Sequence, residues 1–532
     1  TGSCNPLVIL VSGPSMIMIV SCETKGKPMP FSPITDLMNW RLKSRREGID
    51  RMASLPFDMQ KKVFHELMTA LSHTAYGQSF GVTGNITYAD YCAQVPLVNY
   101  ESLLPWVERT MKGEQGLLWP GDIKWFAKSS GTTGTKSKFI PMSRESLEEC
   151  HIAAGVDLVA VYFSQVQSSR LLDGLSLKLG GSSRLNNLKD GSYYGDLSAI
   201  MMQNLPFWAN WRSTPPLDIA LMDEWEAKLE KMAQHVVKED VTSLFGVPSW
   251  MLVLMQRVLE ITGAERLDEV WPHLELFVHG GVSYAPYKDP FADILPQSGI
   301  NLMETYNASE GFFAMQDQLG EEGMLLMLNQ GIFYEFIPMK EFQGRHSTCI
   351  PLEGVKLGVT YALVISTNGG LWRYILGDSI RFVSLAPYRL VVVGRTRLFI
   401  NTFGEELMID NAEQAMAIAC KATGARLVDY SAAPVFMSQS DQGAHQWLIE
   451  FRQAPSNLDS FKLSLDQALK SLNSDYEAKR YKDMVLKAPV ITVARAGCFH
   501  DWLKSKGKLG GQNKVPRLSQ NRDLMDALLA FA

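Results

Sequence analysis

The sequence predicts a mixed α/β protein, with a large N-terminal domain of parallel or mixed sheets covered by helices and a smaller α+β domain after it. Two observations favour this class. Apolar runs of strand length alternate with helical segments through the centre of the chain, which is the pattern of a parallel sheet. After about residue 396 the order changes to helix, two strands, helix, strand and short helix, which is typical of a separate α+β unit.

The composition is that of an ordinary globular protein. Of the 532 residues, 46% are hydrophobic and 20% are charged, and 51 basic against 56 acidic residues leave a net charge of −5. This balance excludes disorder and a surface built to grip nucleic acid or an anionic membrane. The seven cysteines are scattered without a CxxC pair, which favours reduced thiols in the cytoplasm. The oligomeric state stays open, with a monomer favoured.

The first thirty residues are treated as an extension outside the fold, and whether they belong to the natural protein is left open. Their apolar runs, 7–11 and 16–20, are too short for the ~20 residues of a spanning helix. No lysine or arginine precedes Lys25, which argues against a secretory signal. The expected units are the extension 1–30, a large domain 31–395 and a small, mobile domain 396–532.

The start of the large domain is predicted to be helical. From Pro33 to about Gln115 strand signals are few, and residues 55–72 have the spacing of an amphipathic helix. Apolar patches at 125–127 and 139–141 then flank a loop rich in serine, threonine and glycine. This arrangement predicts a strand, a tight loop and a second strand.

Helices and strands alternate through the centre. The expected elements are a helix capped by Asp223, a strand at 241–245, a helix at 248–262, a strand at 274–278, a helix after Pro286 and a strand at 300–306. Pro248 suits a first helical turn and Gly263 a left-handed helix end. Ligands of parallel sheets lie beyond the carboxyl ends of strands, which here carry His279-Gly280-Gly281 and residues 306–310.

The remaining elements are mostly strands until the small domain begins. Strands at 361–365 and 371–374 flank Asn368-Gly369, which predicts a type I′ hairpin. A hinge is expected at Gly394 to Arg397. The small domain is predicted to contain a helix at 407–422, strands at 426–435 and 445–452, a helix at 457–472, a strand at 487–493 and a short helix near Trp502.

The strongest chemical signal is the segment 129–138, Ser-Ser-Gly-Thr-Thr-Gly-Thr-Lys-Ser-Lys, called here the phosphate loop. Its hydroxyls and amides can surround a polyphosphate while its lysines neutralise the charge. It is not a Walker A loop, because Ser130 and Thr135 stand where GxxxxGK[ST] requires glycine. A polar surface loop is the alternative.

Two further segments suit a nucleotide. At Tyr306 to Glu310 an aromatic ring can stack on a base, a hydroxyl can meet phosphate and a carboxylate can hold Mg²⁺. At Tyr374 to Asp378 the carboxylate can accept ribose hydroxyls. Alone, the first is more often a buried tyrosine and a solvated glutamate, and the second a turn.

A basic segment lies near the C-terminus. Residues 501–522 include six lysines and arginines but one acidic residue, Asp501. Glycines beside Lys508 and before Lys514 suggest a loop able to reach an anionic site. A solvated surface is the alternative. Other enzyme motifs fail on spacing: Thr69 breaks an HExxH, and no GxSxG or DxxH completes a hydrolase site.

These four segments, in this order, resemble the acyl-adenylate-forming superfamily and, within it, the Gretchen Hagen (auxin-responsive) family of acyl-acid amido synthetases. The likeness spans roughly residues 31–530. It implies the acyl-adenylate-forming architecture and an ATP-dependent, AMP-forming ligase that adenylates a carboxylic acid and transfers the acyl group to an amine, expected to be an amino acid. An acyl-CoA ligase and a non-catalytic nucleotide-binding protein remain alternatives.

The resemblance also implies the roles of single residues. Catalysis falls to Lys514, with Lys508 a competitor, to Glu310, which also binds Mg²⁺, and to Ser309. The residues expected to bind ATP are Ser129, Ser130, Thr132, Thr133, Lys136, Gly281, Val282, Tyr306, Asp378 and Arg395. Separately, an aromatic and methionine-rich run is a candidate for the acyl pocket, with core packing as the alternative: Met201, Met202, Phe207, Trp208 and Trp211.

Overall fold

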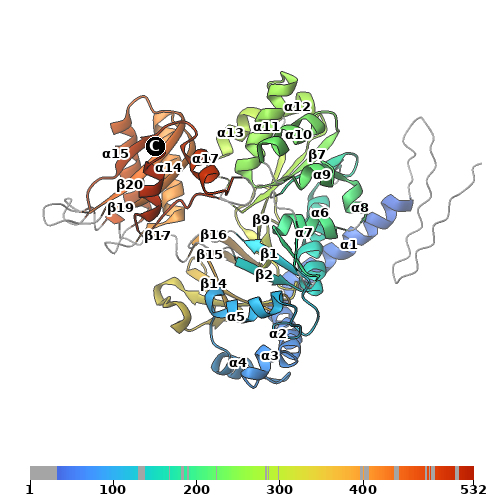
Figure 1. Ribbon diagram of the computed structural model, residues 1–532. Helices are drawn as coiled ribbons and strands as arrows, with labels where there is room; N and C mark the ends of the chain where they lie inside the picture. The colour runs from blue at the N-terminus through green and yellow to red at the C-terminus, as the bar shows by residue number, and fades with distance from the viewer. Residues whose placement is uncertain are drawn as a thin grey trace, which may run out of the picture.

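A twelve-stranded sheet runs through the computed structural model and carries most of its large domain (Figure 1). The structure describes residues 33–129, 138–166, 168–180, 185–188, 191–205, 207–222, 225–281, 284, 287–296, 299–395, 399–400, 407–435, 443–473, 476–477, 480, 486–509, 514–519 and 521–532. The predicted extension, 1–30, lies outside these ranges. Among the described residues, no helix combines the length and the apolar character needed to cross a membrane.

The large sheet has a parallel half and an antiparallel half, in the order β13-β12-β14-β15-β16-β11-β10-β9-β8-β7-β3-β6. The parallel strands are β3 (Leu175–Leu179), β6 (Ser213–Thr214), β7 (Val241–Gly246), β8 (Leu276–Gly280) and β9 (Asn301–Ala308). The antiparallel strands are β10 (Gly311–Met315), β11 (Met324–Leu326), β12 (Ile332–Pro338), β13 (Ile350–Pro351), β14 (Thr360–Thr367), β15 (Tyr374–Leu385) and β16 (Tyr388–Arg395). The predicted mixed sheet is therefore confirmed.

The register of the parallel strands sorts their side chains onto two faces. Val278 lies opposite Phe245 and Met303, and this face joins the main core with a second sheet and its helices. Phe277 points to the other face, into a separate core. The second sheet and the helices that belong to the main core are β1 (Trp125–Ser129), β2 (Lys138–Met142), β4 (Asn186–Asn187), β5 (Tyr193–Gly195), the π-helix η1 (Ser146–Ile152), α6 (Ala153–Gln165) and α7 (Leu197–Asn204). The helices of the separate core on the other face are α10 (Trp225–Val236), α11 (Pro248–Thr262), α12 (Leu267–Val270) and α13 (Lys288–Ile294).

The N-terminal segment is helical, as predicted. Thr74, Thr87 and Asn99 cap three of its helices, because each side-chain oxygen accepts a hydrogen bond from a first-turn N–H. The helices are α1 (Pro33–Ser54), α2 (Pro56–Ser72), α3 (Ala75–Ser79), α4 (Tyr88–Gln94) and α5 (Tyr100–Met111). The other short elements are α8 (Phe207–Trp211), α9 (Leu217–Ala220), η3 (Met339–Glu341), η4 (Gly344–His346) and η5 (Leu352–Gly354).

The type I′ hairpin predicted at Asn368-Gly369 is wrong. The chain does reverse here, but in this turn the positive φ belongs to Gly370 (90°), and the ladder between β14 and β15 resumes only at Tyr374. The reason is tertiary packing: Asn368 is 4% exposed, and a Cβ on Gly331 would lie 2.2 Å from its Nδ2. Buried side chains thus determine the turn in place of the local preference.

The small domain has the predicted order of elements. Gly424 closes its first helix with a φ of 69°, and its two apolar clusters consist of residues after position 395. The prediction lacks a last helix, α18, and two short strands, β17 and β18, before the first helix. The elements are β17 (Phe399–Ile400), β18 (Leu407–Met408), α14 (Ile409–Thr423), β19 (Arg426–Val435), β20 (Ala444–Gln453), α15 (Leu458–Leu472), β21 (Val490–Ala494), α17 (Cys498–Ser505) and α18 (Asp523–Leu529).

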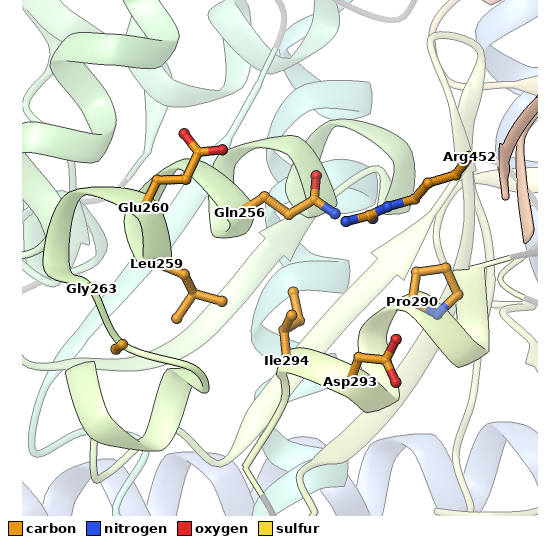
Figure 2. Close-up of a pocket in the computed structure, with 9 residues that line it drawn as sticks. Gln256, Leu259, Glu260, Gly263, Pro290, Asp293, Ile294 and Arg452 are labelled. Carbon is orange, nitrogen blue, oxygen red and sulfur yellow. The ribbon is translucent and has the colours of Figure 1, made fainter. Parts of the chain in front are cut away.

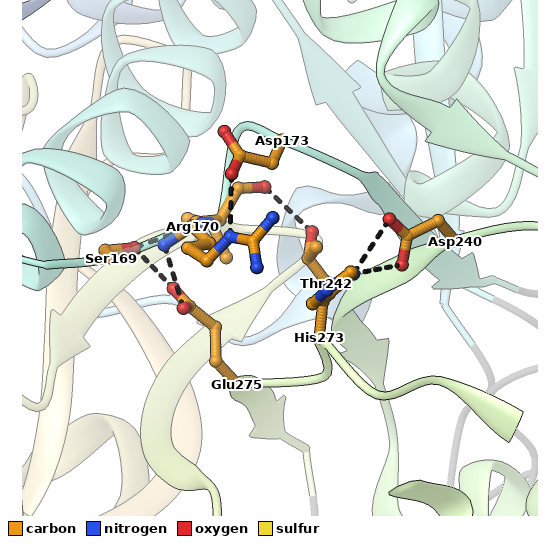
Figure 3. A network of polar contacts seen from close by, with 8 residues as sticks. Ser169, Arg170, Asp173, Asp240, Thr242, His273 and Glu275 are labelled. Carbon is orange, nitrogen blue, oxygen red and sulfur yellow. Dashed lines mark hydrogen bonds and ion pairs between the residues drawn. The ribbon is translucent and has the colours of Figure 1, made fainter. Parts of the chain in front are cut away.

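A polar network fastens the amino ends of the parallel strands (Figure 3). The Glu275 carboxylate, just before β8, accepts hydrogen bonds from the Ser169 hydroxyl and from the Arg170 N–H, the latter at 2.9 Å. The His273 ring contacts both Asp240 oxygens at 3.1 Å. These contacts are structural, because they lie at the end of the sheet opposite to the one where parallel sheets bind ligands.

A buried ion pair supports the start of β15. The Arg373 guanidinium donates two hydrogen bonds to the Glu335 carboxylate, at 3.0 and 2.9 Å, and two more to the carbonyls of Cys92 and Val95. Its φ of 44° is left-handed and strained for a residue other than glycine. Because Tyr374 follows directly, this pair fixes where β15 begins.

Replacing Arg373 with methionine is expected to destabilise the large domain. The Glu335 side chain is 0% exposed, so its carboxylate would stay buried without a partner, at a cost of about 3–5 kcal/mol. Urea unfolding followed by tryptophan fluorescence measures the loss. As a control, Arg144→Met breaks an ion pair whose side chains are 81% and 51% exposed and should leave the midpoint unchanged. Equal midpoints for wild type and Arg373→Met would contradict the role of the pair.

Candidate functional site

The carboxyl ends of β8 and β9 lie side by side and shape the site. A Cβ on Gly280 would lie 2.4 Å from the Thr305 carbonyl oxygen, so only glycine lets the two strands approach so closely. Gly281 has a φ of 76°, which turns the chain away from the sheet. His279 is 4% exposed and stacks on Tyr284 at 4.5 Å. Burial lowers the pKa of His279 to about 4, so it is a neutral packing residue.

Tyr306 and Asp378 meet although 72 residues separate them. The Tyr306 hydroxyl donates a hydrogen bond of 2.7 Å to Asp378 Oδ2. The Tyr306 ring is 7% exposed and packs on Phe313, with 4.9 Å between ring centroids. Two of the segments singled out in the sequence therefore converge on one place in the fold.

A second chain of contacts joins the end of the phosphate loop to the same place. Lys138 Nζ donates to the Tyr374 hydroxyl at 3.4 Å, and this hydroxyl donates to Glu310 Oε1 at 3.5 Å. Lys138 Nζ also lies 5.8 Å from the centroid of the Tyr100 ring. Burial, reinforced by the charge of Glu310, raises the pKa of Tyr374 well above its usual value, so its hydroxyl remains a donor.

The C-terminal basic segment reaches the same strand ends from the small domain. Lys514 Nζ donates a hydrogen bond to the carbonyl oxygen of Gly281, and Leu509 packs against the core beneath α11 and α13. Lys508, the competing candidate, is exposed, and its described backbone contact is a hydrogen bond to Leu503 within its own segment. This geometry favours Lys514 over Lys508.

Several of the expected site residues lie outside the described part of the structure. They are Ser130, Thr132, Thr133, Lys136 and Val282, together with the side chains of Ser129 and Arg395. The backbones of Ser129 and Arg395 end β1 and β16, and Arg395 is the ladder partner of Asp378. Ser309 is 6% exposed in the turn between β9 and β10, next to Glu310. The roles of all these residues stay predictions.

The structure places the residues predicted to line the acyl pocket in different environments. Met202 in α7 is 7% exposed and Met201 packs against the main core, whereas Trp211 is 72% exposed. The side chains of Phe207 and Trp208 lie outside the described residues.

Tyr374 and Tyr100 have no expected role of their own, and Lys138 is expected only to neutralise phosphate charge together with Lys136. Lys138 and Tyr374 belong to segments that had been singled out, but their contact joins positions 236 residues apart. Tyr100 follows the helix cap Asn99 and gave no chemical signal, although its hydroxyl accepts a hydrogen bond from the Phe139 N–H at 2.7 Å.

A separate pocket of about 390 Å³ lies between the two domains (Figure 2). Its walls come from α11 and α13 of the large domain and from Arg452 at the end of β20. Asp293 in this pocket forms an ion pair with Arg426 of the small domain at 2.6 Å. Because the residues that line it include none of the strand-end residues described above, it is not the reaction site.

The described residues contain no group of three or more histidine, cysteine, aspartate or glutamate side chains that could hold a metal ion. A metal in this site would therefore depend on Glu310 and on the phosphates of a bound nucleotide. This donor set fits Mg²⁺, which takes one or two carboxylates together with substrate phosphates and water.

The fold is that of the adenylate-forming enzymes. The chain superposes on a GH3.15 acyl acid amido synthetase with a TM-score of 0.76, at 18% identity over 95% of this chain and 97% of the other. It also matches a 2-hydroxyisobutyryl-CoA ligase, solved in the postadenylation state with 2-HIB-AMP, with a TM-score of 0.57, at 12% identity over 96% and 97%.

The chain belongs to the GH3 family. Models of its N-terminal, central and C-terminal domains match residues 45–300, 325–395 and 410–523, which confirms the resemblance noted in the sequence. Among its relatives is the indole-3-acetic acid-amido synthetase GH3.3 of Arabidopsis thaliana, 23% identical over 94% of this chain and 95% of that protein. Another is the 4-substituted benzoates-glutamate ligase GH3.12 of the same plant, 23% identical over 94% and 98%.

The close approach of β8 and β9 can be tested with Gly280→Ala. The added methyl group would meet the Thr305 backbone, and both strands are held in the sheet, so we expect a loss of about 1–3 kcal/mol in unfolding free energy. Chemical denaturation measures it. As the control, Gly155→Ala adds a methyl in α6 with no heavy atom within 4 Å and should be neutral or stabilise slightly. Equal effects of the two substitutions would contradict the packing argument.

Proposed function

We propose that this chain is an ATP-dependent, AMP-forming acyl-acid amido synthetase, which adenylates a small carboxylic acid and transfers the acyl group to an amino acid. The observation that carries the proposal is the convergence of four distant segments at the strand ends, in a member of the GH3 family. Lys138, Glu310, Asp378 and Lys514 supply the charges of this cluster.

The reaction brings two anions together, and several residues of the site reduce the repulsion between them. The carboxylate of the acid attacks the α-phosphorus of ATP and expels pyrophosphate, so negative charge accumulates at the phosphorus. The phosphate loop, with Ser129, Ser130, Thr132, Thr133 and Lys136, binds the phosphates, and Lys138 adds a cation at its end. Tyr306 and Asp378 hold adenine and ribose, with Gly281 and Val282 beside the base, and Arg395 at the ribose side. Donors fixed before the reaction stabilise this charge at little reorganisation cost.

Glu310 would hold Mg²⁺ together with the phosphates, and the ion would supply electrostatic stabilisation of the leaving pyrophosphate. Tyr374, kept protonated by its burial, donates to Glu310 and so orients the carboxylate. Ser309, buried in the adjacent turn, contacts the α-phosphate. Lys514 lies at the rim of the site, where it neutralises the reacting carboxylate and phosphate.

The second half of the reaction requires room for the amine. The amine attacks the acyl carbon of the acyl-adenylate, AMP leaves, and one proton passes from the amine to solvent. The apolar clusters of the small domain contain only residues after position 395, which supports the rotation of this domain as a body. The boundary is proposed at 395/396, with the hinge at 394–397.

The relatives indicate the class of substrate. The name of one relative includes indole-3-acetic acid, and the name of another includes 4-substituted benzoates and glutamate. For this chain we infer an apolar acid, with the region of Met202 in α7 as part of its pocket, and an amino acid as acceptor. The protein would act in the cytoplasm without nucleic-acid or membrane partners, and a monomer is favoured.

A panel experiment tests the function. Purified protein with ATP, Mg²⁺, a set of carboxylic acids and the amino acids should form AMP and an amide, both read by mass spectrometry. Because the fold also matches a 2-hydroxyisobutyryl-CoA ligase, a parallel reaction contains coenzyme A in place of amino acids. Formation of a thioester without an amide would favour the CoA ligase. Formation of AMP without either product would indicate an adenylating enzyme that uses another acceptor.

Glu310→Ala is expected to lower acid-dependent ATP–pyrophosphate exchange by at least about 10²-fold, the range seen when one preorganised electrostatic contact is removed. The fold should survive, since Glu310 is partly exposed in a turn. Glu341→Ala, which removes an exposed carboxylate in η3, is the matched control and should keep the full rate. Exchange at the wild-type rate in Glu310→Ala would refute its role at the phosphates.

A further inference from the structure

Arg517, three residues after Lys514, connects the two domains. Its guanidinium Nη2 lies 3.4 Å from Asp429 Oδ1 in the small domain and donates a hydrogen bond of 3.3 Å to the Tyr287 hydroxyl of the large domain. The guanidinium carbon also stacks over the Tyr430 ring, 4.6 Å from its centroid. The Arg517 side chain is only 12% exposed, so these contacts are shielded from water and salt.

The segment that carries Arg517 is fixed rigidly to the small domain. The Ala432 N–H donates to the Arg517 carbonyl and the Ser431 hydroxyl to the Pro516 carbonyl, both at 2.8 Å. Leu518 forms a parallel bridge with Ala432, and Leu518 is fully buried. The position of Arg517 therefore reports the position of the whole small domain.

The partners of Lys514 and Arg517 in the large domain are the residue that follows β8 and the residue that precedes α13. Lys514 binds the carbonyl of Gly281, at the end of β8, and Arg517 binds Tyr287, which directly precedes α13. Residues 514–517 thus attach to the large domain at two points, Gly281 and Tyr287. One contact would leave the lysine free to pivot, whereas two define its orientation over the strand ends.

The pair formed by Arg517 and Tyr287 is not arranged for maximal stability. Nη1 of Arg517 is buried without a hydrogen-bond partner among the described residues, and a buried donor without a partner lowers stability. Burial raises the pKa of Tyr287, so the contact is between a charge and a neutral hydroxyl. A contact of this kind can break without leaving two bare charges.

We propose that Arg517 is a positioning residue, which locks the small domain through Tyr287 in the orientation that places Lys514 at the strand ends. This inference rests on the proposed function, because the locked orientation is the one that suits adenylation. Once acyl-adenylate has formed, the domain must leave this orientation to admit the amine. Arg517 is then needed for the first half-reaction and dispensable for the second.

The test separates the two half-reactions. In Arg517→Met, acid-dependent ATP–pyrophosphate exchange should fall about 10- to 100-fold, as expected for a lost hydrogen bond to a charged group. Amide formation from synthetic acyl-adenylate and the amino acid should change less than about threefold. Tyr287→Phe, which removes one oxygen from the opposite domain, should show the same split with a smaller loss, and Arg517→Lys should fall between wild type and Arg517→Met.

A control variant addresses the rest of the interface. Arg426→Met removes an interdomain ion pair whose side chains are 48% and 51% exposed and should leave both half-reactions unchanged. Equal losses in both half-reactions of Tyr287→Phe, or no loss in exchange, would overturn the inference. If Arg517→Met fails to fold, Tyr287→Phe decides alone. Absence of exchange in the wild-type protein would instead refute the proposed function, and the two failures are thereby distinguished.

Discussion

The curvature of the large sheet is the constraint on which the site depends. β9 and β15 are separated by β10, β11 and β16 in the sheet order, so in a flat sheet they would lie about 19 Å apart. A tyrosine and an aspartate side chain cannot bridge that distance, yet the Tyr306 hydroxyl and Asp378 are 2.7 Å apart. The antiparallel half must therefore bend back over the end of the parallel half.

Register shifts provide a physical cause for this bend. They occur in β9–β10 at Phe312/Ala314, in β14–β15 at Ala362/Val364, and twice in β15–β16. A bulge adds a residue to one strand and increases the local twist and bend. The buried pair of Arg373 and Glu335 fixes the strand start beside these bulges, so Tyr374 and Asp378 are brought to the strand ends by the same distortion. The site is consequently a property of the bent sheet rather than of any single loop.

Part of this arrangement could be predicted from the sequence. Parallel strands put their carboxyl ends at one edge, so residues after 278 and after 306 were expected to meet. The contact of Lys138 with Tyr374 was not predicted, because it depends on how a separate sheet packs on the bent one. The hairpin prediction at Asn368 failed for a related reason: burial of that side chain against Gly331 outweighed a local turn preference.

The composition of the domain interface fits an enzyme with two successive geometries. Within the described residues, Leu509 is the one small-domain residue that joins an apolar cluster of the large domain. Two domains that share few residues in a common apolar cluster separate more readily than a continuous core, but such an interface also defines their relative orientation weakly. Orientation then depends on a few directional contacts, of which the pair of Arg426 and Asp293 is exposed to screening by salt. The Arg517–Tyr287 contact is buried and adjoins Lys514. It can therefore hold the small domain in the orientation that places Lys514 at the strand ends without making that orientation permanent.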